Sequence, residues 1–341
     1  MDTMKKVVIS GVKETKIVEL PIPVPFEDWV LVKVHAVPIC TEWKAWKVGR
    51  HYPGHEAAGE VVAVAKPCEV KVGDRVTVMP GMPCGHCDLC RQGEYIHCQS
   101  SSNYREFVDY KIDGDTHVQY LLKPSRLLAP MPDGVSYEKG SLACCALGPV
   151  MGACDNMNVD PFDVVLITGL GPVGLGGVVI SKFRRAKVIG VDCSEYRRNK
   201  AVELGADLVL DPDNPDIVNI IKSFEQGKGP SACLECAGEV SAQRLCIDTV
   251  RRRGKIALIG ECGDDLPIRA SSDFIRTGIT LFGQWHYNLN LIPKIMQVIK
   301  ESPAVDKLIS HVVPMSGLSE ALALNAAEQT AKVIMKPWDN Q

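Results

Sequence analysis

The stretch Thr168-Gly169-Leu170-Gly171-Pro172-Val173-Gly174 decides the fold of the segment around it. It follows the apolar run 163–167, whose β-branched residues predict a buried parallel strand, and it leads into a predicted helix at 172–185. In such a strand–turn–helix unit the first glycine makes the turn, the second lets the backbone approach a pyrophosphate, and the third lets the helix pack on the strand. The N-terminus of the helix then offers N–H groups to the phosphates. The stretch therefore predicts a dinucleotide-binding site.

An acidic residue indicates which dinucleotide this site prefers. Asp192 directly follows the predicted second strand, 187–191. A carboxylate at that place accepts hydrogen bonds from the ribose hydroxyls of NAD and repels the 2′-phosphate of NADP. Arg197 and Arg198 follow closely and offer a guanidinium to a 2′-phosphate. We therefore predict NAD as the cofactor and keep NADP as the less favoured alternative. The alternative interpretation of the glycine stretch is a generic βαβ crossover that binds no nucleotide.

The composition is that of a globular protein with more than one domain. The chain has 341 residues, of which 46% are hydrophobic and 23% charged, and it is too long for one ordinary core. A net charge of −3 gives no reason to expect nucleic acid or an anionic membrane as a partner. Glycines and a proline interrupt the apolar stretch 164–180, unlike a membrane span. Fourteen cysteines without a signal-peptide pattern indicate a reducing, cytoplasmic location, where clustered cysteines bind metal more often than they form disulfides.

Short strands and alternating elements predict two architectures in one chain. The segment 5–37 alternates apolar runs with turn signals, and strand-like runs follow at 57–65, 74–78 and 118–122, which is typical of a small antiparallel β-domain. From about residue 137 helices appear, and strands then alternate with helices as in a doubly wound parallel sheet. The predicted strands of that sheet are 163–168, 187–191, 207–210, 232–235, 254–260 and 279–283, with helices at 172–185, 194–204, 214–225 and 239–251.

The C-terminal part is expected to return to the first domain. A helix at 289–300, an apolar run at 308–314, a helix from residue 316 and a closing strand at 332–336 follow the parallel sheet. The predicted division is therefore a β-rich domain of 1–150 and 290–341 and a nucleotide-binding domain of 151–289 inserted in it.

Four closely spaced cysteines predict a structural metal site. Cys84, Cys87, Cys90 and Cys98 form the pattern C-x2-C-x2-C-x7-C on a loop rich in glycine and proline. Four thiolates at this spacing surround one Zn²⁺ tetrahedrally and leave no open position. An iron–sulfur ferredoxin pattern has a shorter last gap followed by proline, which this loop lacks. The interleaved His86 and His97 are not needed as ligands.

A second, dispersed group of metal-ligating residues predicts an open site. Cys40 follows a strand-like run, His55 and Glu56 are adjacent in the chain, and Cys144 and Cys145 lie further on. One histidine and two cysteines would leave the fourth position of a zinc ion open for an alcohol. Spacing alone does not decide between packing and ligation, nor between Cys144 and Cys145.

On these residues the whole chain resembles the zinc-dependent medium-chain dehydrogenase family, which includes alcohol, polyol and threonine dehydrogenases. The resemblance implies a GroES-like catalytic domain plus a Rossmann domain, assembled as a homodimer or homotetramer, with two zinc ions per chain. It implies that Cys40, His55 and Cys145 hold the catalytic zinc, with Glu56 beside it as an outer group or an occasional ligand and Cys144 as a packing residue. The motifs that carry it are Gly54-His55-Glu56-Ala57-Ala58-Gly59, the four-cysteine loop, the glycine stretch with Asp192, and Glu203-Leu204-Gly205-Ala206-Asp207.

The resemblance implies that zinc acts as a Lewis acid on an alcohol, whose carbinol hydrogen passes to NAD as hydride. The family commonly carries Cys-x-Ser/Thr-Asp after the first ligand, and the hydroxyl starts a proton relay. Here the run is Cys40-Thr41-Glu42-Trp43, so Glu42 stands at the place of that hydroxyl. Our hypothesis is that Glu42 takes the substrate proton directly. The alternatives are that Thr41 substitutes in a loop shifted by one residue, or that Glu42 is an outer or solvent-facing group.

The substrate is a small molecule, and the signals for its class conflict. Cys145 as the third ligand resembles the alcohol branch, whereas the Gly-Pro-Val-Gly form of the fingerprint resembles the polyol branch. The loop after Cys40 is shorter than is common. Aromatic rings suit the C–H face of a sugar or cyclitol, or pack in the core; they belong to Trp43, Trp46, His51, Trp285, His286 and Tyr287.

We predict a secondary alcohol of polyol, sugar or cyclitol type as the substrate, with a simple or aromatic alcohol as the alternative. A rival from another class is an NAD- and zinc-binding structural or regulatory module without catalysis. The zinc ligands disfavour a zinc-free quinone or enoyl reductase.

Overall fold

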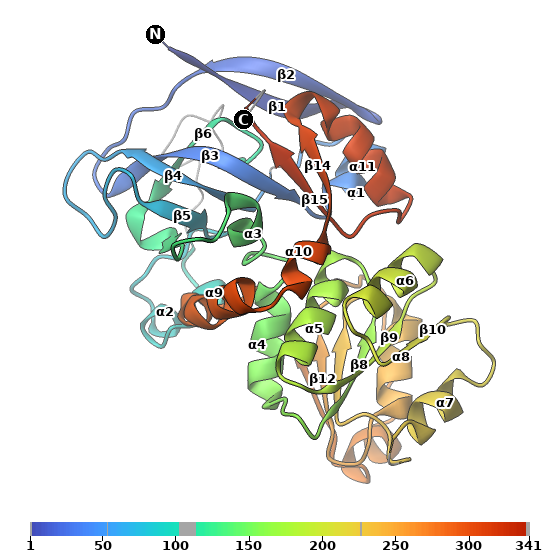
Figure 1. The fold of residues 1–341 in the computed structure, drawn as a ribbon. Helices are drawn as coiled ribbons and strands as arrows, with labels where there is room; N and C mark the ends of the chain where they lie inside the picture. Colours follow the sequence, from blue (N-terminus) through green and yellow to red (C-terminus); the bar gives the residue numbers. More distant parts are fainter. Residues whose placement is uncertain (1, 53, 102–113, 226, 339–341) are drawn as a thin grey trace. The chain divides into compact units, whose positions relative to one another are not determined.

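The chain divides into two compact units (Figure 1). The computed structural model describes residues 2–52, 54–101, 114–225 and 227–338. The first unit comprises Met1–Cys145, Asn288–Glu301 and Ile309–Gln341, and the second comprises Ala146–Tyr287 and Ser302–Leu308. The segment Ser302–Leu308 was expected with the catalytic domain but groups with the second unit, where its helix α10 (Ala304–Leu308) packs on α5 (Pro172–Phe183). Whether each unit folds independently, as the predicted domain division implies, stays a prediction.

The first unit is built on a seven-stranded sheet with the path β14-β15-β3-β4-β5-β7, to which β6 adds by pairing with β3. The long strand β3 (Trp29–Ile39) pairs antiparallel with three strands along its length. Its last residues pair antiparallel with the closing strand, so this C-terminal segment lies in the same sheet. The pair β14–β15 is parallel, an exception to the predicted antiparallel pattern. The other strands are β4 (Ala57–Ala63), β5 (Arg75–Val78), β6 (Tyr120–Pro124), β7 (Leu128–Pro130), β14 (Ile309–Pro314) and β15 (Lys332–Lys336), and a separate hairpin comprises β1 (Thr3–Gly11) and β2 (Glu14–Pro21).

Short helices complete the first unit. Its hydrophobic core contains alternate side chains of β3, the buried ring of Trp46 and the apolar face of α11 (Leu318–Ala326). The Trp46 indole donates a hydrogen bond to Ser319 at 3.1 Å, which joins α1 to α11. The remaining α-helices are α1 (Glu42–Lys47), α2 (Asp88–Arg91), α3 (Tyr137–Ser141) and α9 (Ile292–Glu301).

The second unit contains a six-stranded parallel sheet with the order β10-β9-β8-β11-β12-β13. This is the Rossmann order, and it confirms the predicted doubly wound sheet. The strand before the glycine stretch, β8 (Val164–Thr168), lies in the middle of the sheet and is almost fully buried, as its apolar run predicts. The other strands are β9 (Lys187–Val191), β10 (Leu208–Leu210), β11 (Ala232–Glu235), β12 (Lys255–Leu258) and β13 (Thr280–Gly283), and the further helices are α4 (Gly148–Met157), α6 (Glu195–Glu203), α7 (Ile217–Ser223) and α8 (Val240–Thr249).

Two global properties bear on the sequence predictions. All fourteen cysteines are free, so none is used in a disulfide. Among the described residues, every helix is too short or too polar to reach across a bilayer.

Candidate active site

The first predicted zinc ligand lies where β3 ends. Cys40 follows Ile39 directly, and two side chains hold its backbone. The Asn325 side chain donates to the Cys40 carbonyl at 2.9 Å, and the Glu42 Oε2 atom accepts from the Cys40 amide at 2.6 Å. Both peptide groups next to this thiol are therefore fixed by side chains.

The structure brings all four predicted residues of the open site together. One ligand atom from each of Cys40, His55, Glu56 and Cys145 lies within 4.8 Å of the others. The Nε2 atom of His55 is 3.1 Å from the Cys145 sulfur, close to the roughly 3.5 Å between ligand atoms that a tetrahedral zinc with bonds of 2.0–2.3 Å requires. Two thiols and an imidazole are the donors that zinc prefers. Cys40 and His55 are only half-buried, so the group is accessible to a small molecule.

The carboxylate of Glu56 is held by a buried lysine and by the backbone. Lys332, the first residue of β15, places its ammonium 2.6 Å from Glu56 Oε1, and both side chains are fully buried. The other oxygen accepts from the Cys145 amide at 3.1 Å. Burial raises the pKa of Glu56 although Lys332 opposes this effect. With Lys332 as its partner, Glu56 lies beside the metal-ligating atoms without depending on a metal ion for charge balance.

The ligand set is electrostatically prepared for a cation. The contact with the Cys145 thiol lowers the pKa of Cys40 well below its usual value. Burial opposes this effect, and the charge of Lys332 adds to it. The same thiol–thiol contact, together with burial, raises the pKa of Cys145. Although burial alone would lower it, the contact with Cys40 and the charges of Glu42 and Glu56 raise the pKa of His55 to about 9. A bound metal would replace the protons on His55 and Cys145.

Glu42 is buried against the ligands and does not face solvent. Its side chain is 1% exposed, which excludes the solvent-facing alternative. Its Oε1 atom is 3.5 Å from the Nδ1 atom of His55, so the Nε2 atom of that ring points toward Cys145. A carboxylate on the outer nitrogen of a ligating histidine orients the ring and sets its tautomer. Thr41 directly precedes α1 as its N-cap residue; it is exposed, and its side chain forms no capping hydrogen bond.

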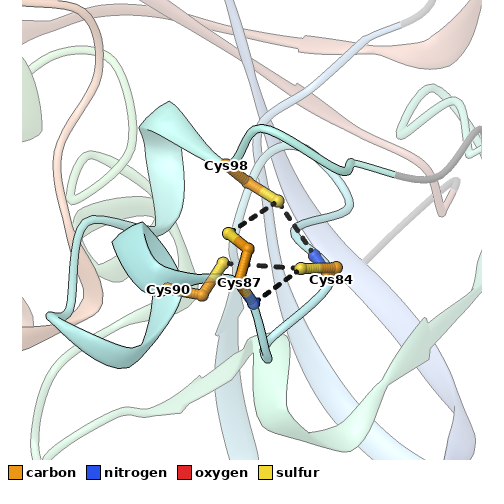
Figure 2. A group of neighbouring side chains, drawn as sticks. All are labelled: Cys84, Cys87, Cys90 and Cys98. Carbon is orange, nitrogen blue, oxygen red and sulfur yellow. Dashed lines mark hydrogen bonds between the residues drawn. The ribbon is translucent and has the colours of Figure 1, made fainter.

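The four-cysteine loop has the geometry of a closed metal site (Figure 2). One sulfur from each of Cys84, Cys87, Cys90 and Cys98 lies within 4.8 Å of the others. Backbone amides point at the sulfurs: Cys84 N–H donates to Cys98 at 3.2 Å, and Cys87 N–H donates to Cys84 at 3.3 Å. Backbone N–H groups lower the pKa of Cys87 to about 6, whereas burial raises that of Cys90 to about 12. The donor set fits one zinc ion with no open position.

The glycine stretch adopts the turn that it predicts. Gly169 has φ +81°, and a Cβ there would lie 2.5 Å from the Ala237 nitrogen. Gly171 precedes α5, and Pro172 occupies its first turn, where a missing N–H costs nothing. Val173 follows in that turn. A Cβ on Gly174 would lie 1.8 Å from the Gly169 carbonyl oxygen, so only glycine lets the helix pack this closely. These residues fit a pyrophosphate at the helix N-terminus.

Asp192 and Arg197 flank this turn in the second unit. Asp192 accepts from Leu170 N–H at 2.6 Å and from Ser194 N–H at 2.8 Å, so it ties the strand end to the glycine loop. A carboxylate has about four acceptor positions, so beside the two amides and the Cys193 thiol at 3.9 Å it keeps acceptor capacity for a ribose hydroxyl. The Arg197 guanidinium lies 4.0 Å from Asp192 and 3.9 Å from the Cβ position of Gly171. Arg198 also lies at this strand end, where it donates to the Asp192 carbonyl at 2.7 Å and forms an ion pair with Asp211 at 2.9 Å.

Comparisons with known proteins match both parts of the chain. The model of the alcohol dehydrogenase GroES-like domain matches residues 27–133, and that of the zinc-binding dehydrogenase matches residues 172–301. L-threonine 3-dehydrogenase from Symbiobacterium thermophilum is 30% identical over 338 residues, which cover 94% of this chain and 93% of that protein. Sorbitol dehydrogenase from Bacillus subtilis is 30% identical over 352 residues, covering 98% and 97%.

The chain belongs to the zinc-dependent medium-chain alcohol and polyol dehydrogenase family. A solved Escherichia coli oxidoreductase of unknown specificity has a TM-score of 0.88 and 27% identity, over 99% of this chain and 100% of that one. An alcohol dehydrogenase from Thermus sp. ATN1, at 22% identity, has the same fold with a TM-score of 0.88. The predicted fold class, a GroES-like domain plus a Rossmann domain, is confirmed.

The structure separates the two candidate cysteines of this dehydrogenase. Cys145 lies in the open ligand group, whereas the buried Cys144 donates its S–H to the Val78 carbonyl at 3.4 Å. Two of the six aromatic residues considered for substrate contact, Trp46 and Tyr287, are buried, whereas Trp285 is exposed. Trp46 is in the core, and the Tyr287 ring occupies the space beside Gly148. The ring of Tyr52 lies 6.3 Å from that of His55, edge to face, and sequence reasoning did not consider it.

Several residues around the ligands of the dehydrogenase were not predicted. Lys332 and Asn325 come from the C-terminal segment, hundreds of residues from the groups they hold. A buried polar cluster beside Gly54 was also missed; its members are Lys6, Asp115, Thr116 and His117. The signal that could have found it is the run Asp115-Thr116-His117, because three polar residues directly before an apolar strand are unusual in a buried position.

Proposed function

We propose that this dehydrogenase oxidises the secondary alcohol of a polyol, sugar or cyclitol to a ketone with NAD, and that NADH and a proton are the other products. The observation that carries the proposal is the convergence of Cys40, His55, Glu56 and Cys145 in a half-accessible group. A zinc ion held there would act as a Lewis acid on the alcohol oxygen, and NAD would accept the hydride. The sorbitol dehydrogenase among the relatives supports a polyol, and the threonine dehydrogenases show that an amino acid is an alternative in this family.

The residues around the ligands hold this chemistry in place. Glu42 fixes the Cys40 amide with one oxygen and faces His55 with the other. Lys332 neutralises Glu56 and lowers the pKa of Cys40, so the thiolate forms more readily. The Oε1 atom of Glu42 is buried and has no hydrogen-bond partner among the described residues. This oxygen is the candidate acceptor for the proton that the alcohol loses.

For the cofactors, we propose two zinc ions per chain and NAD. One zinc would lie on Cys40, His55 and Cys145, and the other on the four-cysteine loop. The support for NAD is the carboxylate of Asp192 at the end of β9, which would repel a 2′-phosphate. Arg197 is close enough to assist with the ribose or phosphate groups, so NADP remains an outcome of the test.

We further propose a homodimer or homotetramer in the cytoplasm. Support for assembly comes from β13, which forms one edge of the six-stranded sheet and whose Leu281 and Phe282 are only half-buried. An uncovered strand edge invites pairing with a second copy. The free state of all fourteen cysteines is compatible with a reducing compartment.

The deciding experiment is NADH formation by the zinc-replete protein on a panel of alditols, inositols, sugars, amino alcohols and simple alcohols, with NAD and with NADP. The zinc content is measured on the same sample. Turnover of polyhydroxy substrates with NAD and about two zinc ions per chain would support the proposal. Turnover of simple alcohols alone would keep the reaction and reject the substrate class. No turnover with both zinc sites filled would favour the structural or regulatory module.

The role of Glu42 is tested by Glu42→Gln. If Glu42 accepts the substrate proton, this variant should lose about 10²- to 10⁴-fold in kcat while keeping its zinc. The matched control is Glu60→Gln on β4, which changes the same charge outside the ligand group. A pH-independent loss of less than tenfold would show that Glu42 only positions Cys40 and His55.

A further inference from the structure

A buried carboxylate holds the backbone next to the histidine of the open ligand group. The Oδ1 atom of Asp115 accepts a hydrogen bond from the Gly54 amide at 2.8 Å, and the Thr116 amide donates to the Gly54 carbonyl at 3.2 Å. Gly54 directly precedes His55 in the chain. The amide and the carbonyl of the residue before His55 are therefore both fixed by the same short segment.

Gly54 also packs against this segment without room for a side chain. A Cβ at Gly54 would lie 2.5 Å from the Thr116 hydroxyl and 2.8 Å from the His117 ring. Both distances are shorter than a van der Waals contact, so a larger residue would push the two segments apart. The segment that bonds to the Gly54 backbone therefore also fills the space beside it.

Asp115 is itself fixed by two basic side chains, which are buried with it. Its Oδ1 atom accepts the His117 amide at 2.9 Å and lies 3.0 Å from the Nδ1 atom of the same residue. Lys6 lies 3.4 Å from the other oxygen. Burial alone would raise the pKa of Asp115, but His117 and Lys6 lower it, so the carboxylate stays charged. A charged acceptor forms a stronger hydrogen bond with an amide than a neutral acceptor does.

The chain on the other side of His55 is held as well. Glu56, the next residue, is paired with the buried Lys332, and β4 starts directly after it. The backbone before His55 is thus held through Asp115, and the backbone after it by the ion pair and the sheet. A ligand that is fixed on both sides keeps its place before a metal binds, so binding does not have to order it.

We propose that Asp115 is a positioning residue for the metal ligand His55. The inference deepens the proposed function and rests on it, because it takes His55 as a ligand of the catalytic zinc. Asp115 is outside the ligand group and acts through the backbone of Gly54. Groups that orient a metal ligand from outside contribute about 10- to 100-fold to metal affinity. Removing Asp115 should therefore weaken the open zinc site and leave the four-cysteine site unchanged.

The test measures the zinc affinity of both sites in the same protein. Competition with chelators of graded strength gives the dissociation constant of each zinc ion for the wild type and two variants. Asp115→Ala removes the acceptor and should weaken the open site about 10- to 100-fold. Asp115→Asn keeps an acceptor oxygen at constant shape and loses only the charge, so the loss should be roughly 3- to 10-fold. The four-cysteine zinc is the internal control, because a general loss of structure in this unit would release both ions.

NMR of the ¹¹³Cd-substituted protein separates positioning from a general loss of stability. The number of sulfur ligands sets the cadmium shift, so the two sites give separate signals. In Asp115→Asn the open-site signal should move while the four-cysteine signal stays. The matched control is Ser125→Ala, which removes a buried hydroxyl that donates to Glu69. Ser125 follows β6, whose end pairs with the start of β3, at the opposite end from Cys40, so this variant should change neither the affinity nor the signals.

Two outcomes would overturn the inference and leave the proposed function intact. One is an unchanged affinity of the open site in Asp115→Ala, and the other is an equal loss of both zinc ions, which would show a purely structural role. If Asp115→Ala does not fold, Asp115→Asn decides, and an unmoved open-site cadmium signal rejects the inference. A wild type that binds zinc at the four-cysteine loop alone would overturn the proposed function, and the inference with it.

Discussion

Replacing Lys332 by methionine tests whether the buried ion pair with Glu56 stabilises the ligand set. The Lys332 ammonium is 2.6 Å from Glu56, and neither side chain is exposed to solvent. Glu56 also accepts the Cys145 amide, so this pair joins β15 to two residues of the ligand group. Methionine fills a similar volume without a charge, and it would leave the Glu56 carboxylate buried without its cation.

The size of the effect follows from this burial. Breaking a buried pair by removing one partner costs about 3–5 kcal/mol in the free energy of unfolding. For a unit of this size that corresponds to a fall of about 6–20 °C in melting temperature. The double variant Lys332→Met/Glu56→Gln removes both charges. It should recover more than half of the loss, because the unpaired charge rather than the missing attraction makes the single variant unstable.

The assay is thermal unfolding of the zinc-loaded protein for the wild type, the two single variants and the double variant. Trp29 and Trp46 are buried in the first unit, so their fluorescence reports its unfolding. The control is Lys336→Met on the same strand. Its ion pair with Glu138 at 3.0 Å is partly exposed, and its removal should cost less than about 1 kcal/mol. An equal fall in melting temperature in Lys332→Met and Lys336→Met would refute the reasoning. So would a fall in the double variant that equals the sum of the falls in the two single variants.

Three further predictions concern other parts of the chain. Asp192→Asn removes the charge that would repel a 2′-phosphate and should raise the NADP-to-NAD ratio of kcat/KM about tenfold or more; an unchanged ratio would contradict the assignment. Cys98→Ser should lower the zinc content by about one ion per chain, measured by mass spectrometry, and unchanged content would place the ion elsewhere. Burial raises the pKa of Glu235 from an ordinary 4.5 to about 7. Between these two pH values the folded state holds a proton on Glu235 that the unfolded state has lost, so the folded state becomes less stable as pH rises from about 4.5 to about 7. Glu235→Gln should flatten this fall in melting temperature between pH 5 and pH 8, and an unaltered slope would exclude Glu235 as its source.

Glu42 shows how a correct position in the sequence can leave a role undecided. Its place after Cys40 indicated a group near the metal-ligating residues, and the structure buries it against Cys40 and His55. The sequence did not show that one oxygen would be used by the Cys40 amide. That hydrogen bond arises from the conformation of the turn into α1, which depends on how this helix packs on α11. Proton acceptance by the other oxygen stays a prediction.

The sequence by itself determined the features that depend on local spacing. The glycine stretch needs only the conformations of consecutive residues, and the cysteine loop brings its four sulfurs together within a short segment, so both could be recognised without a fold. The alternation of strands and helices likewise predicted the parallel sheet, because each element reflects its own hydrophobic pattern.

Only the tertiary structure decided the surroundings of the open ligand group. Lys332 and Glu56 are 276 residues apart in the chain, and Asn325 and Cys40 are 285 apart. Cys144 and Cys145 are neighbours of the same residue type, so the sequence cannot tell which one is the ligand. In the folded chain the Cys144 thiol contacts the Val78 carbonyl, whereas the Cys145 thiol lies in the ligand group. Asp115, Thr116 and His117 face Gly54 because the segment before β6 lies beside the segment before β4. A buried charge or hydroxyl is recognisable only once its partner is known, and these partners are brought together by sheet pairing between distant segments.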